Sequence, residues 1–166
     1  MEILNLIVKA IIFIFPAYVA NATPVLGGGG PPLDFGKKFI DGKPIFGKNK
    51  TIRGFLVGLT CGVSVGLLES AVFNLPYIFG LVVSLGALLG DLAGAFLKRR
   101  LDIAPGNLLP LVDQVDFVIG ALVFSFLFCK SLLTWELALV VLLITPPIHL
   151  LTNFIAYKAG LKANPW

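Results

Sequence analysis

Long apolar stretches constrain the fold of this chain more than any other feature of its sequence. A helix needs about 20 mostly apolar residues to cross a bilayer. Five segments reach or approach that length, at about residues 3–20, 52–73, 75–96, 111–128 and 135–156. The sequence therefore predicts an all-α, polytopic integral membrane protein with five transmembrane helices and two polar loops, at residues 21–51 and 97–110.

The composition supports a single membrane domain over residues 1–166. Hydrophobic residues make up 57% of the chain and charged residues only 13%, whereas soluble domains have about 45–50% and 25%. A water-soluble fold could not cover its surface with so few charges, so the excess apolar surface must face lipid. Cys61 and Cys129 lie in apolar runs, a pattern typical of buried thiols and not of a disulfide framework.

The basic residues indicate the orientation of the chain in the membrane. Eleven Lys and Arg residues lie in the two long loops, at their helix junctions and in the C-terminal tail, and only Lys9 and Lys130 lie near the other side. Because positive charge collects on the cytoplasmic side, we expect both loops, the C-terminus and any active site to face the cytoplasm. The expected location is the plasma membrane.

Three aspartates are expected below the membrane surface, where charge is costly and needs a reason. Asp91 lies seven residues before Lys98, roughly 10 Å inside the cytoplasmic end of the third helix. Asp113 and Asp116 open the fourth helix on one face, at i, i+3 spacing. Adjacent antiparallel helices can bring all three together. The alternatives are an Asp91–Lys98 ion pair and carboxylates that only complement the helix dipole.

Oxygen-only ligands favour a hard cation. With no cysteine or histidine cluster nearby, Asp91, Asp113 and Asp116 predict a Mg²⁺ site, because Mg²⁺ commonly binds a few carboxylates together with substrate phosphates.

A basic segment precedes the second helix. Lys48, Asn49, Lys50, Thr51 and Arg53 lie where the positive end of the helix dipole and free backbone N–H groups favour phosphate. The alternative is that these cations only set the membrane topology. A P-loop is rejected because Asn49 stands where that motif needs Ser or Thr, and no strand precedes it.

The only histidine lies in the fifth helix. His149 and Asn153 are four residues apart and share a face, and Pro146-Pro147 just before them predicts a kink. The pair either lines the pocket and binds a lipid phosphate or is structural.

Several motifs together resemble those of archaeal CDP-archaeol synthases, over the whole chain. They are Pro24-Val25-Leu26-Gly27-Gly28-Gly29-Gly30, Asp34-Phe35-Gly36-Lys37, Gly47-Lys48-Asn49-Lys50-Thr51-Ile52-Arg53-Gly54, Gly90-Asp91, Lys98-Arg99, Pro105-Gly106 and Asp113-Gln114-Val115-Asp116. The wider group of CDP-diacylglycerol synthases has Asp-Arg-x-Asp in the last motif, and Gln114 departs from that pattern.

This resemblance implies a Mg²⁺-dependent transfer of CMP from CTP to unsaturated archaetidic acid (2,3-bis-O-geranylgeranyl-sn-glycerol 1-phosphate), giving CDP-archaeol and diphosphate. The implied catalytic residues are Asp91, Lys98, Arg99, Asp113 and Asp116. Lys48, Asn49, Lys50, Thr51 and Arg53 would bind the triphosphate, and His149 and Asn153 would line the substrate pocket. The expected partners are CTP, an isoprenoid ether-lipid phosphate and the bilayer, with no nucleic acid. A homodimer is compatible with the sequence.

Two other functions fit the sequence less well. A CDP-alcohol phosphotransferase needs an Ala-Arg pair and aspartates four apart, whereas Asp113 and Asp116 are three apart. A small ion- or proton-coupled transporter could use Asp91, but the chain shows no internal repeat of the kind such transporters often have.

Overall fold

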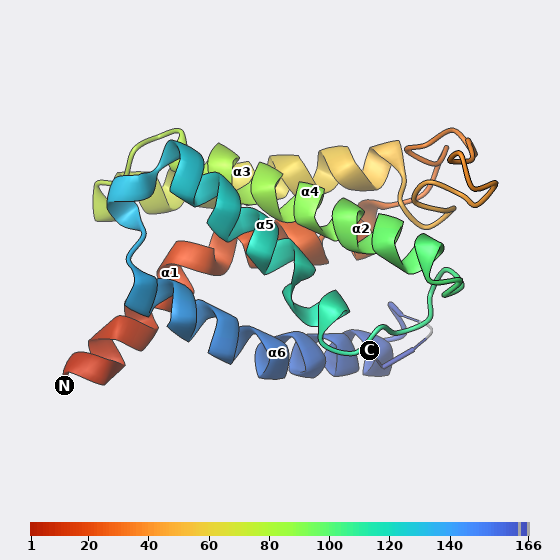
Figure 1. The fold of residues 1–166 in the computed structure, drawn as a ribbon. Coiled ribbons are helices and arrows are strands. Elements are labelled where there is room, and N and C mark those ends of the chain that lie inside the picture. The colour runs from red at the N-terminus through yellow and green to blue at the C-terminus, as the bar shows by residue number, and fades with distance from the viewer. Residues whose placement is uncertain (163, 166) are drawn as a thin grey trace.

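The structure, a computed structural model, describes residues 1–162, 164 and 165 as a bundle of helices. The elements are α1 (Glu2–Ala22), α2 (Pro24–Gly27), α3 (Ile52–Phe73), α4 (Phe79–Arg100), α5 (Val112–Phe128), the short 3₁₀ helix η1 (Lys130–Leu132) and α6 (Trp135–Lys158). The long helices run along one axis, and the two long loops lie at the same end of it (Figure 1). The described residues contain no named strand, only two isolated bridges in the first loop.

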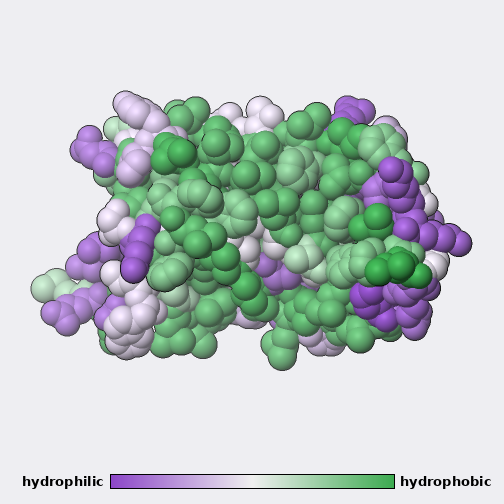
Figure 2. Space-filling view, turned by 45° about the horizontal axis from the view of Figure 1, so that its top comes forward, coloured by the Kyte–Doolittle hydropathy of each residue, from purple (hydrophilic) through white to green (hydrophobic). Residues whose placement is uncertain are grey.

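The surface supports the membrane prediction. On the face that Figure 2 shows, apolar side chains cover most of the middle of the molecule, and hydrophilic residues gather mainly at its two ends. Within the described residues, four helical segments are long and apolar enough to cross a bilayer: Glu2–Gly27, α3, α4 and α6. The remaining predicted span, α5, is present but has 17 residues. The all-helical polytopic class is thus confirmed.

The helix boundaries differ from the prediction at the α3–α4 connection. Asn74 ends α3 in the left-handed conformation, at φ 55°, and α4 begins only at Phe79, whose N–H bonds to the Pro76 carbonyl. Because α4 begins and ends about four residues later than expected, Lys98, Arg99 and Arg100 form its last turn instead of opening the second loop. The basic side chains are therefore fixed to a helix that enters the membrane.

Glycines at every fourth position bring α3 close to its neighbours. Gly54, Gly58, Gly62 and Gly66 are all buried. A Cβ atom on Gly58 would lie 2.5 Å from the Ala20 carbonyl oxygen, and one on Gly62 would lie 2.8 Å from the Pro16 carbonyl oxygen. Small residues at this spacing let membrane helices pack backbone against backbone. This packing holds the start of α3 beside the end of α1.

Helix α1 is the centre of the bundle and contacts α3, α4, α5 and α6. Its Phe13 and Ile14 pack in a core with Phe79 of α4, Phe117 of α5 and Val141 of α6. The result is a closely packed group of helices whose loop end carries the polar residues of the cavity.

Candidate active site

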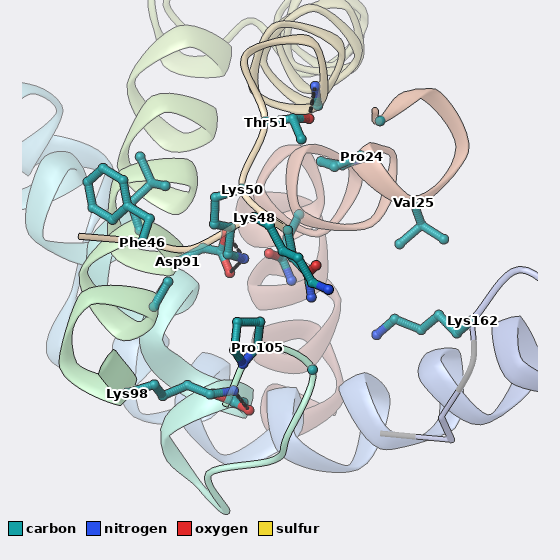
Figure 3. A pocket seen from close by; sticks show the side chains of 18 of the residues that line it. Pro24, Val25, Phe46, Lys48, Lys50, Thr51, Asp91, Lys98, Pro105 and Lys162 are labelled. Carbon is teal, nitrogen blue, oxygen red and sulfur yellow. Dashed lines mark hydrogen bonds and ion pairs between the residues drawn. The ribbon is translucent and has the colours of Figure 1, made fainter. Parts of the chain in front are cut away.

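A cavity of about 760 Å³ opens at the end of the bundle where both long loops and the C-terminal tail meet (Figure 3). Every major element near that end contributes to its wall. The polar and charged lining residues are Asn21, Lys48, Asn49, Lys50, Thr51, Asp91, Lys98, Arg99, Asn107, Asp113, Asp116, His149, Asn153, Lys162 and Asn164.

All but one of the residues predicted for the site line this cavity. The exception is Arg53, which is exposed and does not lie on the cavity wall. The next residue, Gly54, faces the buried side of α3, and one residue along a helix turns the side chain by about 100°. Arg53 therefore projects away from its neighbours Lys50 and Thr51.

Asp91 is bound by a lysine from the first loop. Lys50 Nζ donates to both carboxylate oxygens of Asp91, each at 2.6 Å. The backbone of Lys50 is itself fixed, because its carbonyl accepts a hydrogen bond of 2.7 Å from Leu33 N–H. Burial opposes the charge on Lys50, but the Asp91 carboxylate, with more distant contributions from Asp116 and Asp113, raises its pKa. Lys50 therefore stays cationic at any physiological pH.

Asp113, and not Asp91, is the partner of Lys98. Lys98 Nζ lies 2.6 Å from Asp113 Oδ2, which also accepts a 3.0 Å hydrogen bond from Leu109 N–H. The second loop folds back along the end of α4 and so brings the start of α5 beside Lys98. The two lysine–aspartate pairs thus join different elements: the first loop to α4, and α4 to α5.

Asp116 is seated against α4 by a second set of glycines. Gly86, Gly90 and Gly94 face α5, and a Cβ atom on Gly94 would overlap the Asp116 carboxylate. Gly94 lies one turn after Asp91, so this contact places both carboxylates on the same part of α4. Asp116 Oδ1 accepts a 2.6 Å hydrogen bond from Phe117 N–H. None of the ion pairs among the described residues includes Asp116.

The three aspartates share the cavity wall but do not form a closed ligand set. Among the described residues, no three His, Cys, Asp or Glu side chains lie close enough together to hold a metal ion. Instead, the ammonium groups of Lys50 and Lys98 form ion pairs with Asp91 and Asp113. Nevertheless the donors are all carboxylate oxygens, and the Lys50 ammonium on both oxygens of Asp91 marks a position that favours a cation. The donor chemistry therefore fits Mg²⁺.

The start of α3 supplies the predicted anion-binding features. Thr51 caps the helix, and its side-chain oxygen accepts a 3.0 Å hydrogen bond from Gly54 N–H. Lys48 and Lys50 project into the cavity on either side of the chain that leads to this cap (Figure 3). The positive end of the α3 dipole adds to their charge.

Arg99 is the most deeply buried cation of the site, with 6% of its surface exposed. Its Nε and Nη1 atoms have no hydrogen-bond partner among the described residues. Its Nη1 lies near Gly47 and Pro105, in the motifs that precede the phosphate-binding segment and follow α4. Buried guanidinium donors need partners, and phosphate oxygens match their geometry.

The opposite wall consists of the C-terminal half of α6 and the tail. Asn153 Nδ2 lies 3.2 Å from His149 Nδ1, and Asn153 Oδ1 accepts a 2.8 Å hydrogen bond from Lys162 Nζ. The His149 ring packs on Phe117, with 5.8 Å between ring centroids. Burial lowers the pKa of Lys162. The predicted His149–Asn153 face thus lines the cavity. It also binds Lys162, which the sequence analysis used only as an indicator of membrane topology.

Asp34 organises the first loop and received no role from the sequence. Its carboxylate accepts hydrogen bonds from the N–H groups of Gly36, at 2.9 Å, Phe46, at 2.9 Å, and Gly47, at 3.0 Å. Burial alone would raise the Asp34 pKa, but these donors outweigh it and lower the pKa. The Asp34-Phe35-Gly36 run is typical of an Asx-turn, and this pattern in the sequence could have indicated the structural role of Asp34.

Known proteins are similar to this chain in both sequence and fold. Residues 3–166 match the family model of CarS-like CDP-archaeol synthases. The chain is 43% identical to the CDP-archaeol synthase of Methanococcus aeolicus, over 100% of both chains. It is 42% identical to that of Methanocaldococcus jannaschii, over 98% of both.

A solved structure extends the similarity to three dimensions. It is described as an intramembrane enzyme for archaeal membrane lipids biosynthesis, and it superposes with a TM-score of 0.79 at 39% identity. The match covers 89% of this chain and 94% of that one. A full-length sequence match, a shared fold and a cavity rich in lysine and aspartate agree that the chain belongs to the CDP-archaeol synthase family of membrane enzymes.

Proposed function

We propose that this protein transfers CMP from CTP to unsaturated archaetidic acid in a Mg²⁺-dependent reaction, with CDP-archaeol and diphosphate as products. The observation that carries this proposal is the cavity, in which three aspartates share one space with Lys48, Lys50, Lys98, Arg99 and Lys162. Both substrates are anions, so the main task of the site is to neutralise and orient negative charge.

The reaction needs no nucleophile from the protein. A phosphate oxygen of the lipid attacks the α-phosphorus of CTP, and the bond to the oxygen bridging the α- and β-phosphates breaks. The electron pair leaves with diphosphate. Lys48, Lys50 and the N-terminus of α3 would bind the triphosphate, and the unfilled donors of Arg99 would stabilise charge on the departing diphosphate.

Asp91, Asp113 and Asp116 are the residues that would hold Mg²⁺. When bound, this ion supplies charge neutralisation and orients phosphate oxygens. Lys50 and Lys98, which now lie 2.6 Å from Asp91 and Asp113, would turn to the incoming phosphates. This change of partner would place lysine charge against the anionic phosphates as the substrates enter.

The lipid would reach the cavity between α2 and the end of α6. Val25 and Leu26 of α2 and Leu161 of the C-terminal tail are apolar residues of the cavity wall, so apolar chains would meet apolar surface there. Figure 3 shows Val25 and Lys162 on facing sides of the cavity. Lys162 and Asn153, which lie on the same cavity wall, would then bind the lipid phosphate.

The proposed topology has five spans in the plasma membrane, with both long loops and the C-terminus in the cytoplasm. The 17 residues of α5 extend about 26 Å, slightly less than the hydrocarbon core. A cysteine in place of Lys37, an exposed residue of the first loop, should react with a membrane-impermeant thiol reagent only from the cytoplasmic side. Labelling from outside would contradict this orientation.

The direct test incubates purified protein with radiolabelled CTP and a panel of lipid phosphates. We expect label to move into lipid only when Mg²⁺ is present, fastest with 2,3-bis-O-geranylgeranyl-sn-glycerol 1-phosphate. EDTA should stop the transfer and added Mg²⁺ should restore it. Transfer that is unaffected by EDTA, or faster with an ester-linked phosphatidic acid, would contradict the metal or the substrate assignment respectively.

A further inference from the structure

A set of contacts outside the cavity joins the first loop to the end of α4. We call it the loop clasp and define it as Arg100 and Lys43 with their partners Asp41, Pro44, Phe39, Phe96 and Asp102. We propose that the loop clasp positions residues 48–51 for the triphosphate of CTP, and that Arg100 is a positioning residue for CTP binding. This inference rests on the proposed function of the cavity.

Arg100 makes most of the contacts of the clasp, whereas the two residues before it belong to the cavity wall. Lys98 and Arg99 line the cavity and Arg100 does not. The Arg100 Nε atom lies 2.9 Å from Asp41 Oδ2, and its Nη2 donates a 2.5 Å hydrogen bond to the Pro44 carbonyl. The guanidinium carbon also lies over two aromatic rings, 5.0 Å from the Phe39 centroid and 4.5 Å from the Phe96 centroid.

Lys43 makes the reciprocal contact from the loop to α4. Its Nζ donates a 3.0 Å hydrogen bond to the carbonyl of Arg100 and lies 2.7 Å from Asp102 Oδ2. Within the loop, Phe39 N–H bonds to the Lys43 carbonyl at 2.8 Å. Arg100 of α4 thus contacts the first loop, and Lys43 of the first loop contacts the end of α4. A movement of the loop along α4 would break several of these polar contacts.

The clasped segment leads directly into the phosphate-binding residues. Two and three residues after Pro44, the N–H groups of Phe46 and Gly47 donate to the Asp34 carboxylate, at 2.9 and 3.0 Å. The chain then places Lys48 and Lys50 in the cavity, and Thr51 caps α3. Figure 1 shows this loop folded at the end of the bundle where α3 begins and α4 ends. Residues 48–51 are therefore held from α3 on one side and from the clasp on the other.

The clasp should act on the affinity for CTP and leave the chemical step unchanged. If the loop is free, only a fraction of the molecules presents residues 48–51 correctly, and the apparent affinity for CTP falls by that fraction. Once CTP is bound, the loop is ordered and the reacting groups are unchanged. A rise in KM for CTP with an unchanged kcat is therefore the expected signature.

The test measures steady-state CMP transfer for Arg100→Gln, Arg100→Lys and Asp41→Asn in detergent with Mg²⁺. Loss of a half-buried, charge-assisted contact predicts a rise of about tenfold in KM for CTP in R100Q. The value of kcat and the KM for the lipid should stay within about twofold. R100K keeps the charge but cannot bridge Asp41 and the Pro44 carbonyl, so its KM should lie between those of wild type and R100Q.

The matched control is Lys38→Ala, which removes an exposed cation from the same loop and should leave KM unchanged. If R100Q does not fold, D41N tests the same ion pair from the loop side and retains the acceptor for Lys43 N–H. Wild-type KM for CTP in a folded R100Q or D41N, or a fall in kcat alone, would overturn the clasp. Absence of CTP-dependent product from the wild type would instead overturn the proposed function.

Discussion

The two walls of the cavity hold their lysines in different ways. The aspartate wall (Asp91, Asp113 and Asp116) lies on α4 and α5 and pairs Lys50 and Lys98 with carboxylates at 2.6 Å. On the α6 wall (His149, Asn153 and Lys162), the contacts of the lysine include a 2.8 Å hydrogen bond to the Asn153 amide oxygen. Asp91 raises the pKa of Lys50, whereas burial lowers the pKa of Lys162.

The two walls also differ in packing, because the helix of the aspartate wall is more deeply buried than α6. Twelve residues of α4 are buried but only four of α6, and α4 contacts α5 through Gly86, Gly90 and Gly94. A densely packed helix pair keeps charged groups at fixed positions, which phosphoryl chemistry needs. A sparsely packed helix can yield to substrates of variable shape. We therefore propose that the polyphosphate binds at the aspartate wall and the lipid phosphate at the α6 wall.

The largest expected effect comes from removing one charge of the aspartate wall. Asp91→Asn keeps the shape of the side chain but weakens the cation site and leaves Lys50 without its carboxylate. We expect kcat for CMP transfer to fall by about 10²- to 10³-fold, as when a site loses a preorganised electrostatic contact. Radiolabelled CTP measures this loss, and thermal unfolding in detergent checks that the variant is folded. Turnover within tenfold of wild type would place the chemistry elsewhere.

A smaller effect is expected from moving Asp116 without changing its charge. In Gly94→Ala the new Cβ would overlap the Asp116 carboxylate, so kcat should fall at least about tenfold. The matched control is Gly86→Ala, whose Cβ would meet Gly120 and Phe124 in the same α4–α5 contact and not Asp116. Both should cost about 1–3 kcal/mol of stability from overpacking. Equal kcat values in the two variants would show that helix spacing matters and the position of the carboxylate does not.

The sequence predicted the elements of the aspartate wall but not its ion pairs. The convergence of Asp91 with Asp113 and Asp116 followed from two adjacent antiparallel helices, and all three line the cavity. Lys98 was considered a partner for Asp91, but it lies roughly 10 Å further along the helix, beyond the reach of that carboxylate. The partner of Asp91 comes from the first loop, and the folding of that loop depends on tertiary contacts that no local pattern encodes.

Two features of the fold could have been found in the sequence. Gly54, Gly58, Gly62 and Gly66 repeat at every fourth residue, which marks the packed face of α3 and predicts that Arg53 faces away from it. The Asp34-Phe35-Gly36 turn was also visible. By contrast, Lys162 looked like any other positive charge near the membrane, because its contact with Asn153 requires the tail to fold back over α6.

The smallest expected effect concerns the charge of Lys162 on the α6 wall. Its pKa lies below the usual 10.5, because burial and the cations Lys50 and Lys98 outweigh the attraction of Asp91 and Asp113. As the pH rises, Lys162 should lose its proton before Lys50, whose pKa is raised. The lipid phosphate would then lose a cationic partner, so its KM should rise at alkaline pH while the KM for CTP stays constant.

Substitutions at Lys162 separate this charge from the shape of the wall. Lys162→Gln should raise the KM for the lipid by about fivefold at neutral pH, in line with one charge-assisted hydrogen bond, and should remove most of the alkaline rise. Lys162→Arg keeps its charge at all these pH values and should flatten the profile while retaining affinity. An alkaline rise that persists in both variants, or one that appears in the KM for CTP, would mean that the two walls do not divide the substrates as proposed.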